Sequence, residues 1–340
     1  MTTEAKPSPT AALMKITGQI PLIRSLGLAA ELGLADLLAE RPQTATQLAQ
    51  RCGAHAESLY RMLRYMASHG YFREDDAGTF HNTDLSDVLR EAAPGSMRAW
   101  VRTAWQDVIW DTYRHFPHTI ATGEPAFTKA HGQDFFDYLA RHQDVGARFD
   151  QVMARQSGPE NTGVANAYPF ADAKTVMDVG GGRGGFLATL LRTYPKLRGA
   201  LFEQAHVLKQ ADALRTPELA GRYELVAGNF FDAVPTGADI YTLKRVLHDW
   251  PDETALKILS NARAALGPKA RVLVIDAVIK PGNEPDPNKA LDVGIMALTP
   301  GRERTAADFQ RLFAAAGLKL LRIIPTAAPS TMSIVEGAAT

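Results

Sequence analysis

The feature that most constrains the fold of this chain is a burst of glycines directly after a short apolar segment, residues 175–179. The run continues as Gly180-Gly-Gly-Arg-Gly-Gly185, and an acid, Asp178, stands two residues before it. A strand that enters a helix through glycines lets the backbone approach a bound nucleotide closely, because glycine has no Cβ to collide with it. The segment therefore predicts a nucleotide site at the carboxyl end of a strand in an open α/β sheet.

The acid in this strand bears on which nucleotide binds. A carboxylate beneath the turn repels a pyrophosphate, but it suits S-adenosylmethionine, whose sulfonium and ammonium groups are positively charged. However, Gly180-x-Gly182-x-x-Gly185 also satisfies the dinucleotide pattern, and Glu203, which can accept both ribose hydroxyls, fits NAD as well. From these residues alone a methyl donor, a nicotinamide dinucleotide and a turn without a ligand all stay open.

The pattern after residue 175 predicts a doubly wound α/β sheet. Apolar strands alternate with helical runs, which is typical of parallel strands joined by crossover helices. Two further extended segments, 319–324 and 331–336, flank a turn with two prolines and predict a terminal hairpin that adds an antiparallel strand. The other expected strands are 175–179, 200–203, 224–227, 240–243 and 272–275, and the expected helices are 185–193, 205–214 and 253–266.

The N-terminal part, residues 11 to about 115, predicts helices and one small hairpin. Thr44 or Thr46 is suited to begin one helix as its N-cap. The apolar residues at 59, 62, 63 and 66 have helical spacing, and segments 71–73 and 79–81 flank an acidic turn. Two helices and a hairpin follow the winged-helix plan, which serves either DNA binding or dimerisation. Glu57 and the acidic turn oppose contact with phosphate and favour dimerisation.

The helical region between these parts is rich in aromatic residues, some of which can line a flat apolar pocket. The expected division is therefore a dimerisation domain at 11–100, a helical linker and pocket region at 101–160 and a catalytic domain at 161–338. The pocket candidates are Trp105, Phe127, Phe135, Phe149, Met153 and Met296.

Composition narrows the functional classes. The formal net charge of zero argues against a nucleic-acid binder that relies on a basic field. The single cysteine, Cys52, excludes an internal disulfide framework and cysteine-rich zinc sites. Residues 1–10 lack the apolar core of a signal peptide, and charged residues interrupt the apolar stretch 20–38, which argues against a membrane span. We expect a cytoplasmic enzyme.

Three segments in order carry a family resemblance: Asp178-Val-Gly-Gly-Gly182, Leu243-Lys-Arg-Val-Leu-His-Asp-Trp250 and Gly301-Arg-Glu-Arg-Thr305. Together they resemble the small-molecule O-methyltransferases that use S-adenosylmethionine, including the caffeate type, the hydroxyindole type and the antibiotic-tailoring enzymes of bacteria. The likeness covers nearly the whole chain. It implies a class I methyltransferase fold with a winged-helix dimerisation domain, a homodimer through the N-terminal helices, and S-adenosylhomocysteine as the spent cofactor.

The resemblance also implies roles for individual residues. His248 is the expected general base, flanked by Glu303 and Asp276. Two departures from the family matter, because the family commonly has Asp at the position of Asn229 and Glu at the position of Asp276. The shorter Asp276 would hold the histidine less directly than Glu303. The residues expected around the cofactor are Asp178, Gly180, Gly182, Glu203, Gly228, Asn229, Phe230 and Lys244.

The expected reaction is transfer of a methyl group to a hydroxyl of a small aromatic substrate, with no metal ion. Methylation of nitrogen or carbon, or a family-derived hydroxylation or decarboxylation, is the alternative within this fold. A nicotinamide oxidoreductase is opposed by Asp178 and by the terminal hairpin. A winged-helix DNA-binding regulator is the third alternative. Neither nucleic acid nor a membrane is an expected partner.

Overall fold

The computed structural model describes residues 8–104, 106–328 and 330–340. The chain divides into two compact units, which we call unit 1 (Met1–Asp111 with His142–Val152) and unit 2 (Thr112–Arg141 with Met153–Thr340). The expected linker region 101–160 is shared between them. No helix in the described part of the chain is long and apolar enough to cross a membrane.

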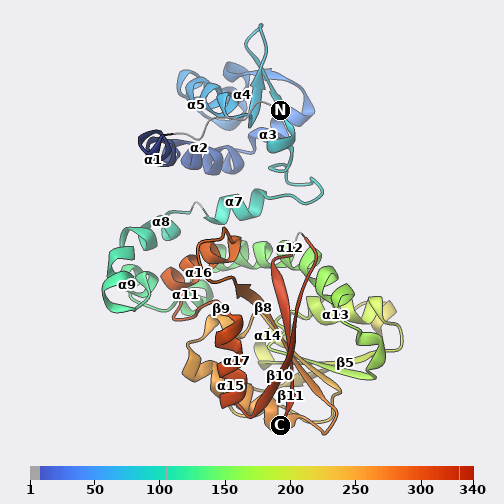
Figure 1. Cartoon of the computed structure of the whole chain (residues 1–340). Helices are drawn as coiled ribbons and strands as arrows, with labels where there is room; N and C mark the ends of the chain where they lie inside the picture. Colours follow the sequence, from blue (N-terminus) through green and yellow to red (C-terminus); the bar gives the residue numbers. More distant parts are fainter. Residues whose placement is uncertain (1–7, 105, 329) are drawn as a thin grey trace, which may run out of the picture. The chain divides into compact units, whose positions relative to one another are not determined.

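Unit 1 is built from helices and a small antiparallel sheet (Figure 1). Thr44 is the N-cap of α4, where its side chain and that of Gln47 form a reciprocal capping box. The apolar stretch 20–38 forms two helices, because Gly33 adopts a left-handed conformation between them. The elements are α1 (Pro9–Thr17), α2 (Ile20–Glu31), α3 (Leu34–Glu40), β1 (Gln43–Thr44), α4 (Ala45–Cys52), α5 (Ala56–Ser68), β2 (Phe72–Glu74), β3 (Thr79–Asn82), α6 (Asp84–Asp87) and α7 (Arg98–Ala104).

The core of unit 1 lies between these helices and the hairpin. Leu59, Leu63 and Met66 of α5 are buried against Phe72 and Phe80 of the hairpin, and Met62 at the edge of the same stripe is half-buried. The expected hairpin is present as β2 and β3, and β1 adds a short strand that the sequence did not predict. Helices followed by this hairpin give the winged-helix plan.

Several elements connect the two units or belong to the helical part of unit 2. They are α8 (Asp107–Arg114), α9 (Phe116–Thr122), α10 (Ala126–His131), α11 (Phe135–Arg141), α12 (Gln143–Ala167) and the 3₁₀ helix η1 (Phe170–Asp172). Pro159 lies inside α12 and removes one backbone donor from that helix.

The sheet of unit 2 has the strand order β10-β11-β8-β7-β4-β5-β6. The strands from β8 to β6 are parallel, whereas β10 and β11 form an antiparallel hairpin, which confirms the predicted mixed sheet. The strands are β4 (Thr175–Val179), β5 (Arg198–Glu203), β6 (Tyr223–Ala227), β7 (Ile240–Lys244), β8 (Arg271–Ile279), β9 (Arg304–Thr305), β10 (Leu318–Pro325) and β11 (Met332–Ala339).

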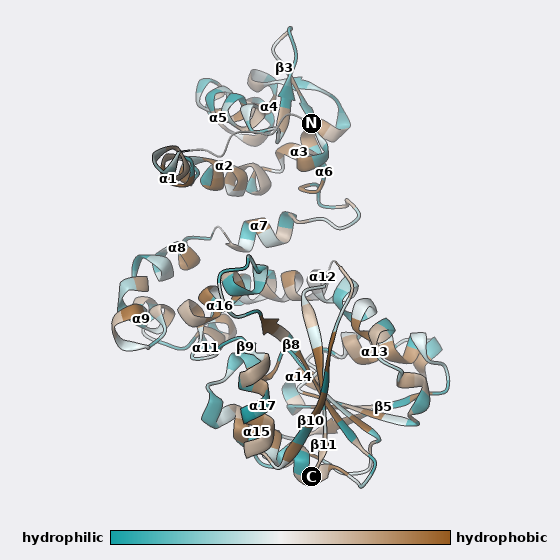
Figure 2. Ribbon diagram, viewed as in Figure 1, coloured by the Kyte–Doolittle hydropathy of each residue, from teal (hydrophilic) through white to brown (hydrophobic). Residues whose placement is uncertain are grey.

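Helices cover both faces of this sheet, and consecutive strand residues pack to opposite sides. Val176 packs with residues of α13, and Met177 packs with residues of α15 and α17. Figure 1 shows α13 on one side of the sheet and α15 and α17 on the other. Figure 2 shows β8, a strand inside the sheet, in brown, in agreement with burial on both faces. The helices are α13 (Gly185–Thr193), α14 (Ala205–Leu208), η2 (Pro217–Leu219), η3 (Leu247–Asp249), α15 (Asp252–Ala265), α16 (Pro287–Leu298) and α17 (Ala306–Ala315).

One predicted helix of unit 2 is wrong in length. The expected helix 205–214 ends at Leu208, and the chain continues in turns. Leu208, Ala211 and Leu214 are nevertheless all buried in the same core. Their spacing of three residues therefore reflects burial of one side of a turning segment and not a continuous helix.

The strand order changes direction between β4 and β7, because β4 pairs with β5 on one side and with β7 on the other. Ligands of open α/β sheets bind beyond the carboxyl ends of the strands at such a point. The carboxyl ends of β4 and β7 lead into the glycine turn and into η3, which carries His248.

Candidate active site

The glycine turn follows β4 and leads into α13. Gly180, Gly182 and Gly184 have φ angles of +68°, +57° and +76°, a region that favours glycine. A Cβ on Gly181 would lie 2.3 Å from Oδ2 of Asp178, so the backbone passes directly over this carboxylate. The sequence pattern thus has a steric reason at each of these positions.

Asp178 is fully buried beneath the turn. Its Oδ1 accepts a hydrogen bond from Thr242 Oγ1 at 2.8 Å, whereas Oδ2 has no hydrogen-bond partner among the described residues. Burial raises the pKa of Asp178 to about 6, although the Thr242 bond and the charge of Lys244 act in the opposite direction. Because no part of it is exposed, Asp178 can act on a ligand above the turn only through space.

Glu203 at the end of β5 connects that strand to the glycine turn. Its Oε2 accepts from the backbone N–H of Gly182 at 3.1 Å, and its Oε1 accepts from that of Gln204 at 2.7 Å. A ring stands on the other side of the turn: a Cβ on Gly180 would lie 3.2 Å from Phe230 Cε1. The structure therefore brings Gly180, Gly182, Glu203 and Phe230 together.

The segment after β6 supplies the remaining expected cofactor residues. A Cβ on Gly228 would lie 2.3 Å from the ring of Phe202, so a larger residue does not fit there. Asn229 is exposed, and its Oδ1 accepts from the backbone N–H of Phe231 at 3.0 Å. This bond fixes the side-chain oxygen of Asn229 against the backbone of its own loop.

These residues fit a cationic nucleoside. The buried Asp178 carboxylate has an unpartnered oxygen, and the half-buried Glu203 adds a second carboxylate beside the same turn. Two acids at one turn repel a pyrophosphate and favour a positively charged ligand. Phe230 presents a ring beside the turn for stacking on a base.

Lys244 and Arg245 at the end of β7 both face Glu160 of α12, a residue that sequence reasoning missed. Lys244 Nζ lies 3.4 Å from Glu160 Oε2, and Arg245 Nη2 lies 2.6 Å from Glu160 Oε1. Burial lowers the pKa of Lys244, against the opposing charge of Glu160. The polar end of Lys244 is therefore engaged by α12.

His248 lies in η3 and is buried. Its Nδ1 lies 2.8 Å from Glu303 Oε1, and its Nε2 lies 3.6 Å from Asp249 Oδ1. Burial by itself lowers the pKa of His248, but Asp249, the Glu303 bond and Asp276 outweigh it and raise the pKa to about 9. The imidazole is thus a stronger base than a free histidine.

Asp276 lies inside β8, because this strand continues to Ile279 and not only to residue 275, where it was expected to end. Neither of its carboxylate oxygens has a hydrogen-bond partner among the described residues. Burial raises its pKa to about 7, against the opposing charge of His248. Of the two expected flanking acids, the structure places Glu303 in contact with His248 and Asp276 near it without a hydrogen bond.

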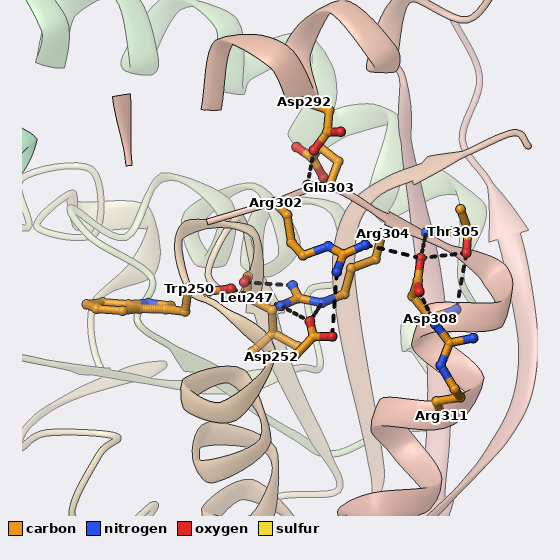
Figure 3. A network of polar contacts seen from close by, with 10 residues as sticks. All are labelled: Leu247, Trp250, Asp252, Asp292, Arg302, Glu303, Arg304, Thr305, Asp308 and Arg311. Atoms are coloured by element: carbon orange, nitrogen blue, oxygen red, sulfur yellow. Dashed lines mark hydrogen bonds and ion pairs between the residues drawn. The ribbon is translucent and has the colours of Figure 1, made fainter. Parts of the chain in front are cut away.

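The segment 301–305 binds the backbone of residues 247–250, which carry His248 and which we call the His248 loop (Figure 3). The side chain of Arg304 is almost fully buried and donates to Leu247 O at 2.8 Å, to Trp250 O at 2.9 Å and to Asp252 Oδ1 at 2.9 Å. The backbone N–H of Arg302 donates to His248 O at 2.9 Å. Sequence reasoning singled out this segment but missed the role of Arg304, because its partners lie more than fifty residues away.

The expected pocket residues have different surroundings. Phe127 and Phe135 pack edge to face with ring centroids 5.1 Å apart, and Phe127 has no exposed surface. Helix α10, which carries Phe127, packs on α16, which carries the half-buried Met296. Met153 is half-buried in unit 2, Phe149 is half-buried in the part of α12 that belongs to unit 1, and Trp105 lies outside the described residues.

A cavity of about 430 Å³ lies in unit 1, lined by charged residues such as Arg24, Glu31 and Arg102. It contains none of the expected catalytic or cofactor residues. In the described part of the chain, no group of three or more His, Cys, Asp or Glu residues is arranged to hold a metal ion.

Comparison with known proteins agrees with this geometry. Residues 113–319 match the model of an O-methyltransferase domain, and residues 14–91 match that of an O-methyltransferase dimerisation domain. The phenazine O-methyltransferase PhzM of Lysobacter antibioticus is 39% identical over 98% of this chain and 96% of its own length. The mitomycin biosynthesis 6-O-methyltransferase of Streptomyces lavendulae is 38% identical over 92% of this chain and 90% of its own length.

Solved structures show the same fold. The O-methyltransferase NcsB1 from neocarzinostatin biosynthesis, in complex with S-adenosylmethionine and 2-hydroxy-5-methyl naphthoic acid, superimposes with a TM-score of 0.84. The two chains are 32% identical, and the match covers 99% of this chain and 100% of that one.

Proposed function

This chain belongs to the O-methyltransferases that use S-adenosylmethionine, and we propose that it methylates a phenolic hydroxyl of a small aromatic secondary metabolite with His248 as the general base. The observation that carries the proposal is the 2.8 Å contact between His248 Nδ1 and Glu303 at the carboxyl end of the sheet. Membership of this family excludes the nicotinamide oxidoreductase, which the glycine turn alone left open.

The proposed acceptor class is a fused-ring aromatic with a free hydroxyl. One relative named above is a phenazine O-methyltransferase, the other is a 6-O-methyltransferase of mitomycin biosynthesis, and the solved neighbour holds a naphthoic acid. Aromatic residues in unit 2 and the half-buried Met153 and Met296 support an acceptor of this kind, because rings and thioethers pack well on flat apolar surfaces.

Bound S-adenosylmethionine supplies an activated methyl group, so the task of the protein is chiefly to bind and align the two substrates. Gly180, Gly182 and Glu203 would hold its methionine and ribose parts, and Asn229 and Phe230 its base. These residues meet at the carboxyl ends of β4, β5 and β6 in the structure.

The proton chemistry follows from the contacts of His248. In the neutral imidazole, an Nδ1–H group donates to Glu303 and leaves Nε2 as the proton acceptor. A phenol has a pKa of about 10 and His248 one of about 9, so the proton transfer between them is nearly balanced. The negative charge of Glu303 also stabilises the imidazolium that forms.

Replacement of the histidine tests this role. His248→Ala should lower turnover at least ~100-fold, because a positioned general base typically contributes about 10²–10⁴-fold. Binding of S-adenosylhomocysteine, measured by calorimetry, should stay nearly unchanged. His69→Ala, at an exposed histidine of unit 1, is the matched control and should keep full turnover. Full turnover in His248→Ala would refute the base.

The acceptor class is tested by a screen with labelled donor. Hydroxylated phenazines, naphthoates and quinones should accept label, and their amino or O-methylated counterparts should accept little. Preferential labelling of amines or of ring carbons would instead support the alternative of nitrogen or carbon methylation.

A further inference from the structure

Arg245, between β7 and the His248 loop, has a strained backbone. Its φ of +54° is the only positive value at a non-glycine position among the described residues. A side chain with a Cβ rarely adopts this conformation, and such strain persists only where the surroundings hold it. Strained residues of this kind cluster at functional sites.

The side chain of Arg245 pairs with Glu160. Arg245 Nη2 donates to Glu160 Oε1 at 2.6 Å and Arg245 Nε donates to Oε2 at 3.1 Å, which makes a two-pronged ion pair. The Glu160 side chain is only 12% exposed. Two parallel bonds fix the direction of a guanidinium as well as its distance, and Lys or Gln cannot reproduce them.

Burial pushes the pKa of Glu160 upward, but the Arg245 bond and the charges of Arg245 and Lys244 outweigh it and hold this pKa below its usual value. The carboxylate is therefore ionised at neutral pH, and the ion pair keeps its charge there.

The position of Arg245 links the two halves of the site. Its backbone N–H donates to Ile275 O at 3.0 Å, next to Asp276. The following residue, Val246, lies against the glycine turn, since a Cβ on Gly180 would lie 3.1 Å from Val246 Cγ2. His248 comes two residues later. A shift of the backbone at Arg245 would move both the wall of the cofactor turn and the imidazole.

Glu160, the other member of this ion pair, directly follows a proline inside α12. Gly158 and Pro159 directly precede Glu160, and a proline inside a helix removes a backbone hydrogen bond. The side chain of Glu160 thus ties the helix to the sheet just after this point.

We propose that Glu160 is a positioning residue for methyl transfer: by its ion pair it holds Arg245 in the left-handed conformation that places His248 opposite the cofactor turn. This inference rests on the proposed function of His248. It assigns no contact between Glu160 and either substrate.

Glu160→Gln tests the proposal, because it keeps the shape of the side chain and removes its charge. We expect turnover per folded molecule to fall about 10–100-fold, since a displacement on the order of 1 Å can cost about 10²-fold. The number of folded molecules is counted from the stoichiometry of S-adenosylhomocysteine binding in calorimetry, and the Kd of that ligand should change much less than turnover.

A matched control is available at another buried glutamate. Glu336 of β11 also pairs with an arginine, Arg322, at 2.5 Å, and accepts a hydrogen bond from Tyr168. Glu336→Gln should lower the melting temperature without changing turnover per binding site. A purely structural role of Glu160 would give this same result in Glu160→Gln and would overturn the proposal.

Two substitutions at Arg245 separate the strain from the ion pair. Arg245→Ala removes the pair and keeps a Cβ in the strained conformation, whereas Arg245→Gly removes the pair and the strain together. We expect Arg245→Gly to retain several-fold more turnover per site than Arg245→Ala. Equal turnover in the two variants would contradict the role of the left-handed conformation.

Turnover of His248→Ala should be measured in the same series of experiments. If His248→Ala keeps full turnover, the base assignment fails. If His248→Ala is inactive and Glu160→Gln keeps full turnover per site, only the positioning role fails.

Discussion

At the scale of single residues, the environment of His248 determines its protonation. Asp249, Asp276 and Glu303 surround a buried imidazole, and together they raise its pKa to about 9 against the effect of burial. We therefore expect the free enzyme to carry a proton on His248 at neutral pH. The proton must leave before the imidazole can serve as a base, so turnover should rise with pH towards about 9.

The pKa of His248 can be measured directly by NMR of labelled histidine, with its signal assigned by its loss in His248→Ala. We expect a midpoint near 9, well above the usual value of about 6.5. Glu303→Gln keeps the hydrogen-bond geometry but removes a negative charge, so the midpoint should fall by about 1–3 pH units. Glu336→Gln, at a remote buried acid, should leave it unchanged.

The same shift has a consequence for stability. The pKa of His248 is higher in the folded state than in the unfolded state, so protonation of His248 stabilises the fold fully below pH 6.5. This contribution is lost as the pH rises through about 9. A titration midpoint near 6.5 for His248 in the folded protein would contradict both the expected rise of turnover towards pH 9 and the expected loss of stability above pH 6.5.

At the scale of secondary-structure elements, two short segments are held unusually close together. The turn before β9 crosses the His248 loop at Gly301, where a Cβ would lie 2.0 Å from His248 O and 2.6 Å from the carbonyl carbon of Asp249. Both neighbours are backbone atoms, so neither can rotate away. The side chain of Arg304 then binds the same loop from β9 (Figure 3).

Gly301→Ala should therefore separate these two segments. Overpacking of a close contact typically costs about 1–3 kcal/mol, which should appear as a lower free energy of unfolding in denaturant titrations. Turnover of the molecules that remain folded should also fall, because Glu303 and His248 lie on the two separated segments. Gly267→Ala is the control, since a Cβ there meets nothing within 4 Å. Unchanged turnover in Gly301→Ala would show that the loop adapts without moving His248.

Elements with a strong local signal could be predicted from the sequence. The bounds of β4 and α13 agree with the prediction, because an apolar run and a glycine turn define them locally. The very short strands β1 and β9 were not predicted, since a strand of two residues has no alternation to detect. The predicted helix 205–214 was too long because buried turns can imitate helical spacing.

The residues of the functional site also divide into those with a local sequence signal and those without one. The glycine turn, Glu203, His248 and Glu303 could be named from their motifs, although their catalytic roles stay predictions. The pair of Glu160 and Arg245 spans 85 residues of sequence, and the contacts of Arg304 span more than fifty. No local pattern reports such contacts, because the fold alone brings the partners together. The left-handed Arg245 could not be predicted either, as only glycine commonly indicates that conformation.

At the scale of the whole molecule, helix α1 of unit 1 has an exposed apolar surface. Helix α1 has no buried residue, and Leu13, Met14 and Ile16 are 67%, 69% and 65% exposed. Figure 2 shows brown along this helix. Three large apolar side chains on one short helix are costly in water. Since residues 14–91 match an O-methyltransferase dimerisation domain, a second copy of the chain is the expected partner.

Charge on α1 should therefore weaken the homodimer. Burial of a Leu or Ile side chain contributes about 1.5–3 kcal/mol, and Leu13→Glu with Ile16→Glu would remove two such contributions from each copy and add repulsion. Sedimentation at micromolar concentration should show a dimer for the wild type and mostly monomer for the double variant. The control is Ile120→Glu in α9 of unit 2, where the isoleucine is equally exposed at 66%. If both proteins sediment as the same dimer, α1 does not form the interface, whereas dissociation of the Ile120→Glu control would show that any added surface charge has this effect.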